Sequence, residues 1–406
     1  MAGEWRDLRW GDLATLEYGR ALRSYDTSSG RFRVFGTNGP IGWHDKALCS
    51  HPGVIIGRKG AYRGVHYSSA PFFVIDTAFY LEPKVEMDLR WAYYELLTQD
   101  INGMDSGSAI PSTSREAFYS LPVRVPPPDE QRTIACILRT LDDKIELNRR
   151  MNETLEAIAR ALFKSWFVDF DPVRAKAEGR DPGLPKPIAD LFPDRFENSD
   201  LGRIPKGWEV ATLGDVAEHP RRGVQPDQIE PETPYIALDH MPKRCIALSG
   251  WDTAEGLESN KFEFKTGEIL FGKLRPYFHK VGVAPVDGVC STDIVVVTPR
   301  EDRWFGFVLG HVSSTAFVEY TNAGSTGTKM PRTSWGEMAR YPVVVPPANI
   351  AEAFNAQIRS AIDRIVVSTH ESRTLAALRD ALLPKLLSGE IRIKDAKKKM
   401  AAGIFP

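Results

Sequence analysis

The chain has 406 residues, which is long enough for two domains of ordinary size and the segments that connect them. Hydrophobic residues make up 42% of the sequence and charged residues 26%, as in an ordinary folded protein. The formal net charge of −1 argues against a uniformly basic nucleic-acid-binding protein. It leaves room for a basic face, because phosphate contact depends on local charge rather than on the charge of the whole chain.

The sequence carries no obvious targeting signal. The first residues contain no basic stretch that leads into an apolar run, so we expect no signal peptide. No apolar run approaches the ~20 residues that a membrane helix needs, which predicts no membrane partner. The four cysteines, Cys49, Cys136, Cys245 and Cys290, lie far apart in the sequence. This spacing favours reduced thiols in a cytoplasmic protein over a disulfide framework or a zinc site.

Residues 1–128 are predicted to form a first, β-rich domain. Short runs of Val, Ile, Phe and Tyr alternate there with Gly, Pro, Asn and Asp, which is typical of strands and turns. Several polar loops carry side chains that can neutralise phosphates or bond to base edges. These DNA-binding candidates are Thr37, Asn38, Arg58, Lys59, Tyr62, Arg63, Ser106, Ser108 and Arg115.

Residues 129–170 are predicted to form one long helix. Apolar residues recur there four and three positions apart, a spacing that places them along one seam. The seam consists of Ile134, Leu138, Leu141, Ile145, Leu155, Leu162 and Trp166. Polar residues, Asn148 and Asn152, occupy its centre. From Ile134 to Trp166 the helix would be roughly 50 Å long at about 1.5 Å per residue.

Residues 171–206 are rich in Pro, Gly and Asp, have no sustained period and are predicted to be a connector. A second β-rich domain is predicted over residues 207–348. Its polar loops match those of the first domain in kind and in order. The DNA-binding candidates here are Arg221, Arg222, Lys273, Arg275, Tyr277, Thr326, Thr328, Lys329 and Arg332.

Residues 349–390 are predicted to form a second long helix, followed by a charged tail over residues 391–406. Its seam residues lie 220 positions after their counterparts in the first helix; they include Phe354, Ile358, Ile365, Leu375, Leu382 and Leu386. Polar residues again occupy the centre, here Ser368 and Ser372. Pro384 is expected to kink or end this helix.

The two halves of the chain form an internal repeat. Trp10–Ala14 resembles Leu213–Ala217, and Leu121–Pro127 resembles Tyr341–Pro347. The repeat predicts an α+β fold with two β-rich domains, each followed by a long helix.

The packing of the two helices is open at this stage. An antiparallel coiled coil with pseudo-two-fold symmetry suits the long connector, while a parallel pair would place both domains at one end. Each helix could instead pack on its own domain. The polar centre could fix the register of a helix pair, or mark a place where the helices splay and water enters.

A search for catalytic patterns finds no candidate catalytic residue and no candidate metal ligand. The segment Gly267–Lys273 has the spacing of a phosphate-binding loop, but Leu274 stands where Ser or Thr would bind magnesium. Its intervening residues resemble a strand. The eight histidines are scattered, and each fits a structural role better than a ligand role.

Several segments resemble the specificity subunits of type I restriction-modification enzymes. Thr140–Arg149 and Ala161–Phe170 are similar to the central repeated region of that family, and Leu382–Ile391 is similar to its C-terminal ending. The strings Pro126–Gln131, Pro205–Trp208 and Gly272–Tyr277 are also typical of it. The resemblance spans essentially the whole chain. Ala348–Ile350 departs from the family pattern at the start of the second helix.

The resemblance implies a non-catalytic subunit that recognises double-stranded DNA. Each β-rich target-recognition domain would read one half of a split, asymmetric site, and an antiparallel helix pair would set the gap between the halves. Two modification subunits would dock on the helices, bind S-adenosylmethionine and methylate adenine at N6. A restriction subunit can add cleavage driven by ATP and Mg. No cofactor is expected in this chain itself.

Two other functions compete with this interpretation. A coiled-coil adaptor without DNA recognition would explain the near-neutral charge. An independent nuclease or methylase is disfavoured by the missing catalytic motifs. The recognised base sequence cannot be derived from the loop residues.

Overall fold

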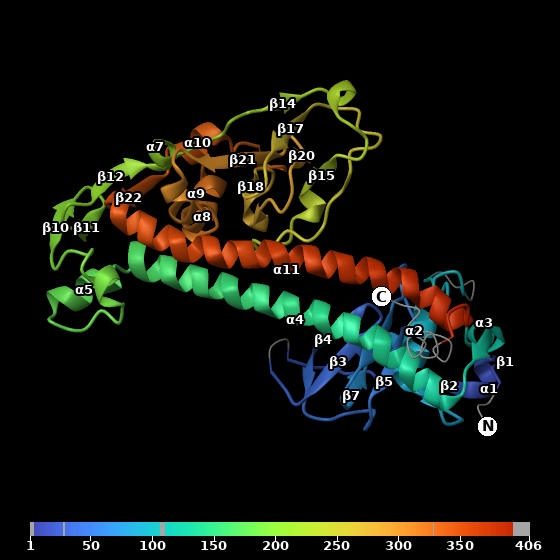
Figure 1. Cartoon of the computed structure of the whole chain (residues 1–406). Coiled ribbons are helices and arrows are strands. Elements are labelled where there is room, and N and C mark those ends of the chain that lie inside the picture. Colours follow the sequence, from blue (N-terminus) through green and yellow to red (C-terminus); the bar gives the residue numbers. More distant parts are fainter. Residues whose placement is uncertain (1–3, 27–28, 106–109, 328, 393–406) are drawn as a thin grey trace, which may run out of the picture. The chain divides into compact units, whose positions relative to one another are not determined.

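A computed structural model describes residues 4–26, 29–105, 110–327 and 329–392 (Figure 1). The chain divides into two compact units by its internal contacts. The first unit contains the residues up to Lys144 and those from Leu375 onward, and the second contains Ile145–Thr374. Each unit therefore holds one β-rich region together with parts of both long helices, and each is described by itself. Most of the predicted tail lies outside the described residues.

The first unit builds its β-rich region from three small sheets. Strand β1 pairs antiparallel with β9, four strands follow the order β2-β8-β5-β6, and three follow the order β4-β3-β7. The elements are β1 (Arg6–Arg9), α1 (Trp10–Leu13), β2 (Ala14–Tyr18), β3 (Phe32–Gly36), β4 (Gly39–His44), β5 (Gly53–Gly57), β6 (Val65–Ser68), β7 (Phe72–Val74), β8 (Ala78–Pro83), α2 (Leu89–Leu97), α3 (Arg115–Ser120) and β9 (Pro122–Val125).

The second unit has a related set of sheets. Strand β12 pairs antiparallel with β22, four strands follow the order β13-β21-β18-β19, and five follow the order β14-β17-β20-β15-β16. Its strands are β12 (Glu209–Thr212), β13 (Ala217–Glu218), β14 (Gly223–Val224), β15 (Pro234–Ile236), β16 (Asp252–Thr253), β17 (Lys261–Phe264), β18 (Ile269–Gly272), β19 (Val281–Val283), β20 (Gly288–Cys290), β21 (Ile294–Pro299) and β22 (Pro342–Val345). Its short helices are α7 (Leu213–Val216), α8 (Phe305–Val312), α9 (Thr315–Ala323) and α10 (Trp335–Ala339).

The internal repeat is visible in matching backbone contacts. In the first unit the Trp10 amide donates to the Leu121 carbonyl at 3.0 Å, and in the second the Leu213 amide donates to the Tyr341 carbonyl at 2.9 Å. At the start of α1 the Arg9 amide donates to the Asp12 carboxylate at 3.0 Å, and at the start of α7 the Thr212 amide donates to the Asp215 carboxylate at 2.8 Å. The two β-rich regions are therefore built on one plan, as the repeat predicted.

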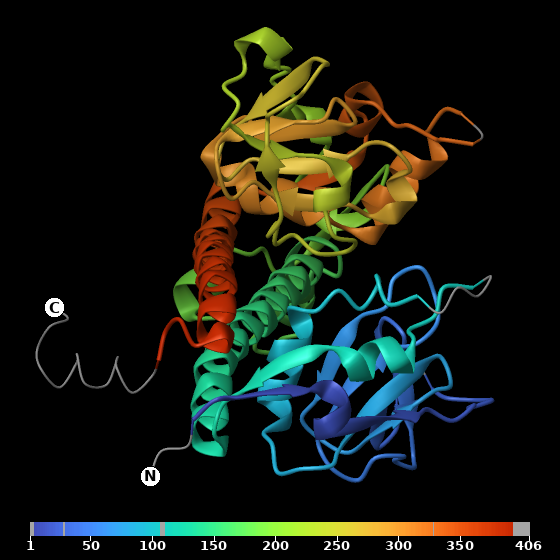
Figure 2. The ribbon, with the colours of Figure 1, turned by 90° about the vertical axis from the view of Figure 1, so that its right-hand side faces the viewer.

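Two long helices follow the two β-rich regions: α4 (Pro128–Phe167) and α11 (Ala348–Ser388). Within the first unit, the early part of α4 packs against the last turns of α11 around Ile134, Leu138 and Leu386. Arg379 of α11 forms an ion pair with Asp142 of α4 at 2.9 Å, and the Tyr94 hydroxyl donates to the same carboxylate at 2.6 Å. Figure 2 shows the strands of this unit, in blue, beside the first part of α4.

Within the second unit, the remaining parts of the two helices also run in opposite directions. Near the end of α4, the rings of Phe163 and Trp166 pack on Phe354, which lies near the start of α11, with ring centroids 6.4 and 5.5 Å away. In each unit the two helix segments are antiparallel. All of the predicted seam residues are buried or half-buried.

The polar centre of the helix pair is closed rather than splayed. Asn148 is fully buried, and its side-chain amide donates to the carboxylate of Glu371 at 2.8 Å and to the Ser372 hydroxyl at 3.2 Å. Ser368 is fully buried as well. A buried asparagine bonded across the helices is the arrangement that fixes a register. These contacts favour the register interpretation over a water-filled opening.

Two details differ from the sequence-based predictions. Helix α11 does not end at Pro384 but continues to Ser388. The proline lies at an exposed position in the last turns, where the carbonyl freed by its missing N–H can bond to water. The predicted connector has some regular structure of its own: helices α5 (Asp171–Ala177) and α6 (Lys186–Ala189), and a hairpin of β10 (Phe196–Ser199) and β11 (Gly202–Pro205).

Candidate nucleic-acid interface

Two loops of the first unit that lie far apart in the sequence are joined through their backbones. In the loop that follows β5, the Arg58 carbonyl accepts a hydrogen bond from the Thr113 amide at 2.9 Å. The Gly60 amide donates to the Pro111 carbonyl at 3.0 Å, and the Thr113 hydroxyl donates to the Gly57 carbonyl at 2.8 Å. Candidate residues from both loops, including Arg58 and Arg115, therefore belong to one surface.

The turn between β3 and β4 joins the same loops. The Gly64 amide donates to the Thr37 carbonyl at 3.1 Å, so the turn that carries Thr37 and Asn38 is held beside the loop after β5. Gly39 follows at a φ of 106°, a left-handed conformation that glycine adopts without strain. Three segments with candidate residues thus converge on one side of the first β-rich region.

Arg63 is the one candidate in this group whose placement does not fit a DNA contact. Its side chain is buried, with 3% of the residue exposed. The guanidinium donates to the carbonyls of Gly60 at 3.0 Å and of Asn102 at 2.5 Å. Because its donors satisfy buried carbonyl groups, Arg63 holds the loop in place and is not available to a ligand. The prediction for Arg63 is corrected accordingly.

Tyr18, at the end of β2, is a surface residue that the loop patterns did not single out. Its side chain is half exposed, and the guanidinium groups of Arg58 and Arg115 lie over its ring at 4.7 and 5.2 Å from the centroid. Arg115 also donates to the Tyr119 hydroxyl at 3.0 Å. A flat aromatic ring that supports two guanidinium groups restricts their orientation, which suits contacts with phosphates or base edges.

The second unit repeats the loop arrangement of the first. The Thr333 amide donates to the Lys273 carbonyl at 3.1 Å, and the Arg275 amide donates to the Pro331 carbonyl at 2.7 Å. The loop after β18 is thereby joined to the loop that carries Lys329 and Arg332, as the loop after β5 is joined in the first unit. Arg332 lies 3.2 Å from the carboxylate of Asp293. The two β-rich regions present equivalent loop pairs with different side chains.

Positive charge gathers around the second loop pair. Burial lowers the pKa of His219, and the nearby charges of Arg221, Lys273 and Arg222 lower it further. Arg222 forms an ion pair with Glu268, so the Arg222 guanidinium is less available to a ligand. Arg221 and Arg275 adopt left-handed backbone conformations, with φ of 48° and 51°. Such strained positions on non-glycine residues are found at functional loops more often than elsewhere.

The remaining DNA-binding candidates fall into those outside the described residues and those exposed to solvent. Ser106, Ser108 and Thr328 lie outside the described residues. The others that are well exposed to solvent are Asn38, Lys59, Tyr62, Arg221, Tyr277, Thr326, Lys329 and Arg332. This set offers hydrogen-bond donors and aromatic faces. Its chemistry is that of binding an anionic, hydrogen-bonding surface.

Other kinds of site find little support in the part of the chain that the structure describes. Within it, no cluster of three or more His, Cys, Asp or Glu side chains is placed to hold a metal ion. The segment Gly267–Lys273 contains strand β18 rather than a phosphate-binding loop. No helix among the described residues has the length and apolar character that crossing a membrane requires.

Comparisons with known proteins agree on one family. Residues 2–157 match the model of the type I restriction modification DNA specificity domain. The MjaIX specificity subunit of Methanocaldococcus jannaschii is 26% identical over 331 residues, which are 77% of this chain and 71% of that protein. The HindI specificity subunit of Haemophilus influenzae is 26% identical over 348 residues, 74% of each chain. The EcoDI specificity subunit of Escherichia coli is 23% identical over 361 residues, 85% of this chain and 78% of that one.

Over most of its length, the chain is similar to the specificity subunits of type I restriction enzymes.

A solved structure supports the fold of this chain over nearly its whole length. The S subunit of a type I restriction-modification system from M. genitalium superimposes with a TM-score of 0.61 at 16% identity, covering 95% of this chain and 96% of that one. This likeness concerns the fold of the chain, including its two β-rich regions. The exposed loop residues that they share are the best candidates for a nucleic-acid interface.

Proposed function

We propose that this chain is a specificity subunit that reads a bipartite, asymmetric DNA target, one half-site per recognition domain, and catalyses no reaction itself. The observation that carries the proposal is the pair of equivalent, backbone-joined loop surfaces, one around Arg58 and one around Lys273. Arginine and lysine at such positions contact phosphates and guanine edges, and asparagine contacts adenine. Because the side chains of the two surfaces differ, each would read a different sequence.

The neutral net charge does not oppose this proposal. The chain holds 52 Lys and Arg residues against 53 Asp and Glu residues. Many acidic groups are already paired within the helices, for example Glu146 with Arg149 at 2.7 Å and Asp143 with Arg139 at 2.9 Å. DNA responds to the electrostatic potential of the loops that it contacts. The ion pairs within the helices leave this local potential unaffected.

The partners would be two methyltransferase subunits that dock on the helices. Large apolar side chains are exposed at matching positions of the helices: Leu147 and Val367 are 59% and 55% exposed, and Ile158 and Leu378 are 50% and 47% exposed. The members of each pair are 220 residues apart, the spacing of the internal repeat. We take these repeated exposed positions as candidate contact sites for other proteins. Their repetition favours two copies of one partner over two different partners.

The methyltransferase partners would bind S-adenosylmethionine and methylate adenine at N6. A restriction subunit, where it joins, would supply ATP- and Mg-dependent cleavage. Such a complex acts on DNA in the cytoplasm. These parts of the proposal rest on the family resemblance.

The experiment that tests the proposal is co-expression of this chain with its methyltransferase partner in a host that lacks adenine methylation, followed by sequencing for methyladenine. A split, asymmetric motif methylated on both strands is expected. A continuous motif would contradict two recognition domains with separate half-sites. Absence of methylation, together with no DNA binding by the assembled complex at low salt, would favour the adaptor alternative, which the relatives do not support.

A further inference from the structure

The paired loops of each unit meet in a short antiparallel β-bridge. In the first unit Lys59 lies opposite Ser112, and in the second Leu274 lies opposite Arg332. Two backbone hydrogen bonds flank each bridge in the same way: Gly60 to Pro111 at 3.0 Å and Thr113 to Arg58 at 2.9 Å, then Arg275 to Pro331 at 2.7 Å and Thr333 to Lys273 at 3.1 Å. Because the flanking residues carry these bonds, each bridge is a non-hydrogen-bonded pair, in which both side chains lie on one face and close together.

The basic residue changes sides between the two bridges. In the first unit it is Lys59, in the loop after β5, and Ser112 lies opposite. In the second unit it is Arg332, in the loop before α10, and Leu274 lies opposite. The Cβ atoms of such a pair are about 4.5–5.5 Å apart, which is within the reach of a lysine or arginine side chain. A positive charge from either position can therefore occupy the same place on the surface.

Both basic side chains face outward. The residue after the bridge on the second loop is buried in each unit, since Thr113 and Thr333 are each 5% exposed. Successive side chains of an extended segment point to opposite faces, so Ser112 and Arg332 point away from the core together with the residues opposite them. Lys59 is exposed, and 52% of the Arg332 side chain is exposed. Both cations are accessible to a ligand.

The ion pair of Arg332 does not use its whole guanidinium group. The contact with the Asp293 carboxylate runs through Nε, at 3.2 Å. A guanidinium carries further N–H donors on its two terminal nitrogens. The half-exposed side chain can therefore hold Asp293 and contact a phosphate at the same time.

An exposed tyrosine follows the bridge in both units. Tyr62 comes three residues after Lys59 and is 78% exposed, and Tyr277 comes three residues after Leu274 and is 50% exposed. A tyrosine hydroxyl beside a cation is a frequent donor to the phosphates of DNA. The two loop pairs thus share a cation and an aromatic hydroxyl group.

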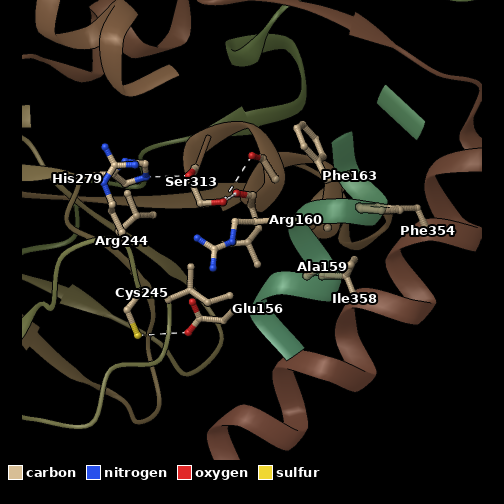
Figure 3. A pocket seen from close by; sticks show the side chains of 15 residues that line it. Glu156, Ala159, Arg160, Phe163, Arg244, Cys245, His279, Ser313, Phe354 and Ile358 are labelled. Carbon is tan, nitrogen blue, oxygen red and sulfur yellow. Dashed lines mark hydrogen bonds between the residues drawn. The ribbon is translucent and has the colours of Figure 1, made fainter. Parts of the chain in front are cut away.

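The second β-rich region is held on the helices by other loops. Figure 3 shows Glu156 of α4, whose carboxylate accepts from the Cys245 thiol at 3.3 Å and from the Ala247 amide at 3.0 Å. The cavity beside this contact has about 40 Å³ of room, which is space for a few water molecules. The attachment of the region to α4 therefore does not depend on the bridge that carries Arg332.

The two halves of an asymmetric target differ in their bases but share the same sugar-phosphate backbone. A base edge requires a particular donor geometry, and lysine and arginine differ in that geometry. A phosphate requires mainly a positive charge within reach. A charge that keeps its place while both the residue type and the loop change therefore fits a phosphate better than a base.

We propose that Lys59 and Arg332 are equivalent phosphate contacts, one in each half-site, and that they position the DNA without selecting bases. This inference rests on the proposed function and deepens it, because it separates two residues that fix the register of the DNA from those that read its sequence.

The test measures DNA binding by the full chain, assembled with its methyltransferase partner, over a range of salt concentrations. Lys59→Ser and Arg332→Ser should each weaken binding about tenfold near 0.1 M salt and lower the slope of log K against log salt by about 0.9. The methylated motif should stay the same at every position. Arg203→Ser removes one exposed positive charge from hairpin β10–β11 and should leave the slope unchanged.

DNA with a single uncharged methylphosphonate locates each contact. The wild-type complex should lose affinity when the modification falls on one phosphate of each half-site. Lys59→Ser should be insensitive to the modification in one half-site only, and Arg332→Ser in the other only. Sensitivity that is unchanged in both variants would overturn the proposal.

A relocated charge tests the equivalence of the two bridge positions. Leu274→Lys combined with Arg332→Ser gives the second bridge the arrangement of the first, and it should regain the slope that Arg332→Ser loses. This recovery also shows that the single variant was folded. A double variant that binds no better than Arg332→Ser would overturn the proposal.

The remaining outcomes separate this inference from the function on which it rests. A motif that becomes degenerate within one half-site would assign the cation to a base and overturn the inference alone. A salt slope that does not change in either single variant would do the same. A wild-type complex that neither binds nor methylates DNA would overturn the proposed function together with the inference.

Discussion

Lys329 and Arg58 illustrate how single residues of the two loop surfaces are expected to act. Lys329 is exposed in the second unit, and Arg58 rests on the Tyr18 ring in the first. A side chain that contacts a base edge contributes about 1–3 kcal/mol of discrimination, whereas a phosphate contact affects all sequences equally. The two classes of contact can therefore be separated by the pattern of methylation and not only by its extent.

We expect Lys329→Ala to change methylation through one half-site only. If the lysine contacts a base, the methylated motif becomes degenerate at one or two positions of that half-site. If it contacts a phosphate, the motif is unchanged and the salt dependence of DNA binding weakens by about one counterion. Methyladenine sequencing and binding at several salt concentrations measure the two effects. Arg203→Ala, in hairpin β10–β11, serves as the exposed control, and degeneracy in both half-sites would contradict one domain per half-site.

Glu95 should make the stability of the first unit depend on pH. Burial raises the pKa of this carboxyl group to about 7, against the opposing effect of hydrogen bonds from Gln99 and Trp10. The folded chain then holds a proton between pH 4.5 and about 7 that the unfolded chain releases. The stabilising contribution is complete below pH 4.5 and is lost as the pH rises through 7.

Glu95→Gln should remove this pH dependence. The variant is expected to be more stable than the wild-type chain at pH 8, by on the order of 3 kcal/mol at most, and equally stable near pH 4.5. Melting temperatures between pH 4.5 and 8 measure the effect. The exposed Glu86→Gln is the matched control in the same unit. A constant difference across this range would show that Glu95 is not the titrating group.

At the scale of the helices, the apolar residues proposed to dock a partner differ from those that hold the two helices together. The seam residues between α4 and α11 are buried or half-buried, whereas Leu147 and Val367 point to solvent at matching positions. Changes at these two positions should leave the helix pair intact, because neither side chain contributes to the hydrophobic clusters of either unit.

Leu147→Asp and Val367→Asp should each weaken the docking of one methyltransferase subunit. Loss of a buried leucine or valine contact and burial of a charge would cost about 2 kcal/mol or more, roughly thirtyfold in Kd. Native mass spectrometry should detect complexes with one methyltransferase subunit for each single variant and none for the double variant. Leu201→Asp, in the β10–β11 turn, is the control. Two bound subunits in both single variants would place the docking surface elsewhere.

The elements differ in how well the sequence predicted them. The long helices followed from apolar spacing alone, because a heptad pattern sustained over many turns is characteristic of helices that pair along their length. The repeat indicated that the two β-rich domains carry similar polar loops, but it did not predict which loops lie side by side. The burial of Arg63 was missed, because nothing local distinguishes an arginine that satisfies buried carbonyls from one on the surface. Tyr18 was missed because a tyrosine at the end of a strand is usually part of the packing.

At the scale of the whole molecule, the shared plan of the two units leads to a further prediction. Replacing residues 207–348 with a second copy of residues 1–128 should give a chain whose two recognition domains are identical. Because the helices that follow them are antiparallel, the methylated motif should become a gapped palindrome of the first half-site. Methyladenine sequencing measures the motif. An asymmetric motif from this chain would show that residues outside the recognition domains contribute to sequence reading.

The hydrogen bonds that join the loops in each unit run largely between main-chain atoms, as between Thr113 and Arg58 and between Thr333 and Lys273. A substitution at an exposed side chain of these loops therefore leaves the framework of the surface in place. New target sequences can arise by the exchange of a few side chains, without a loss of stability that selection would have to repair. The recognised sequence could therefore change in small steps, while the main-chain framework of each loop surface stays constant.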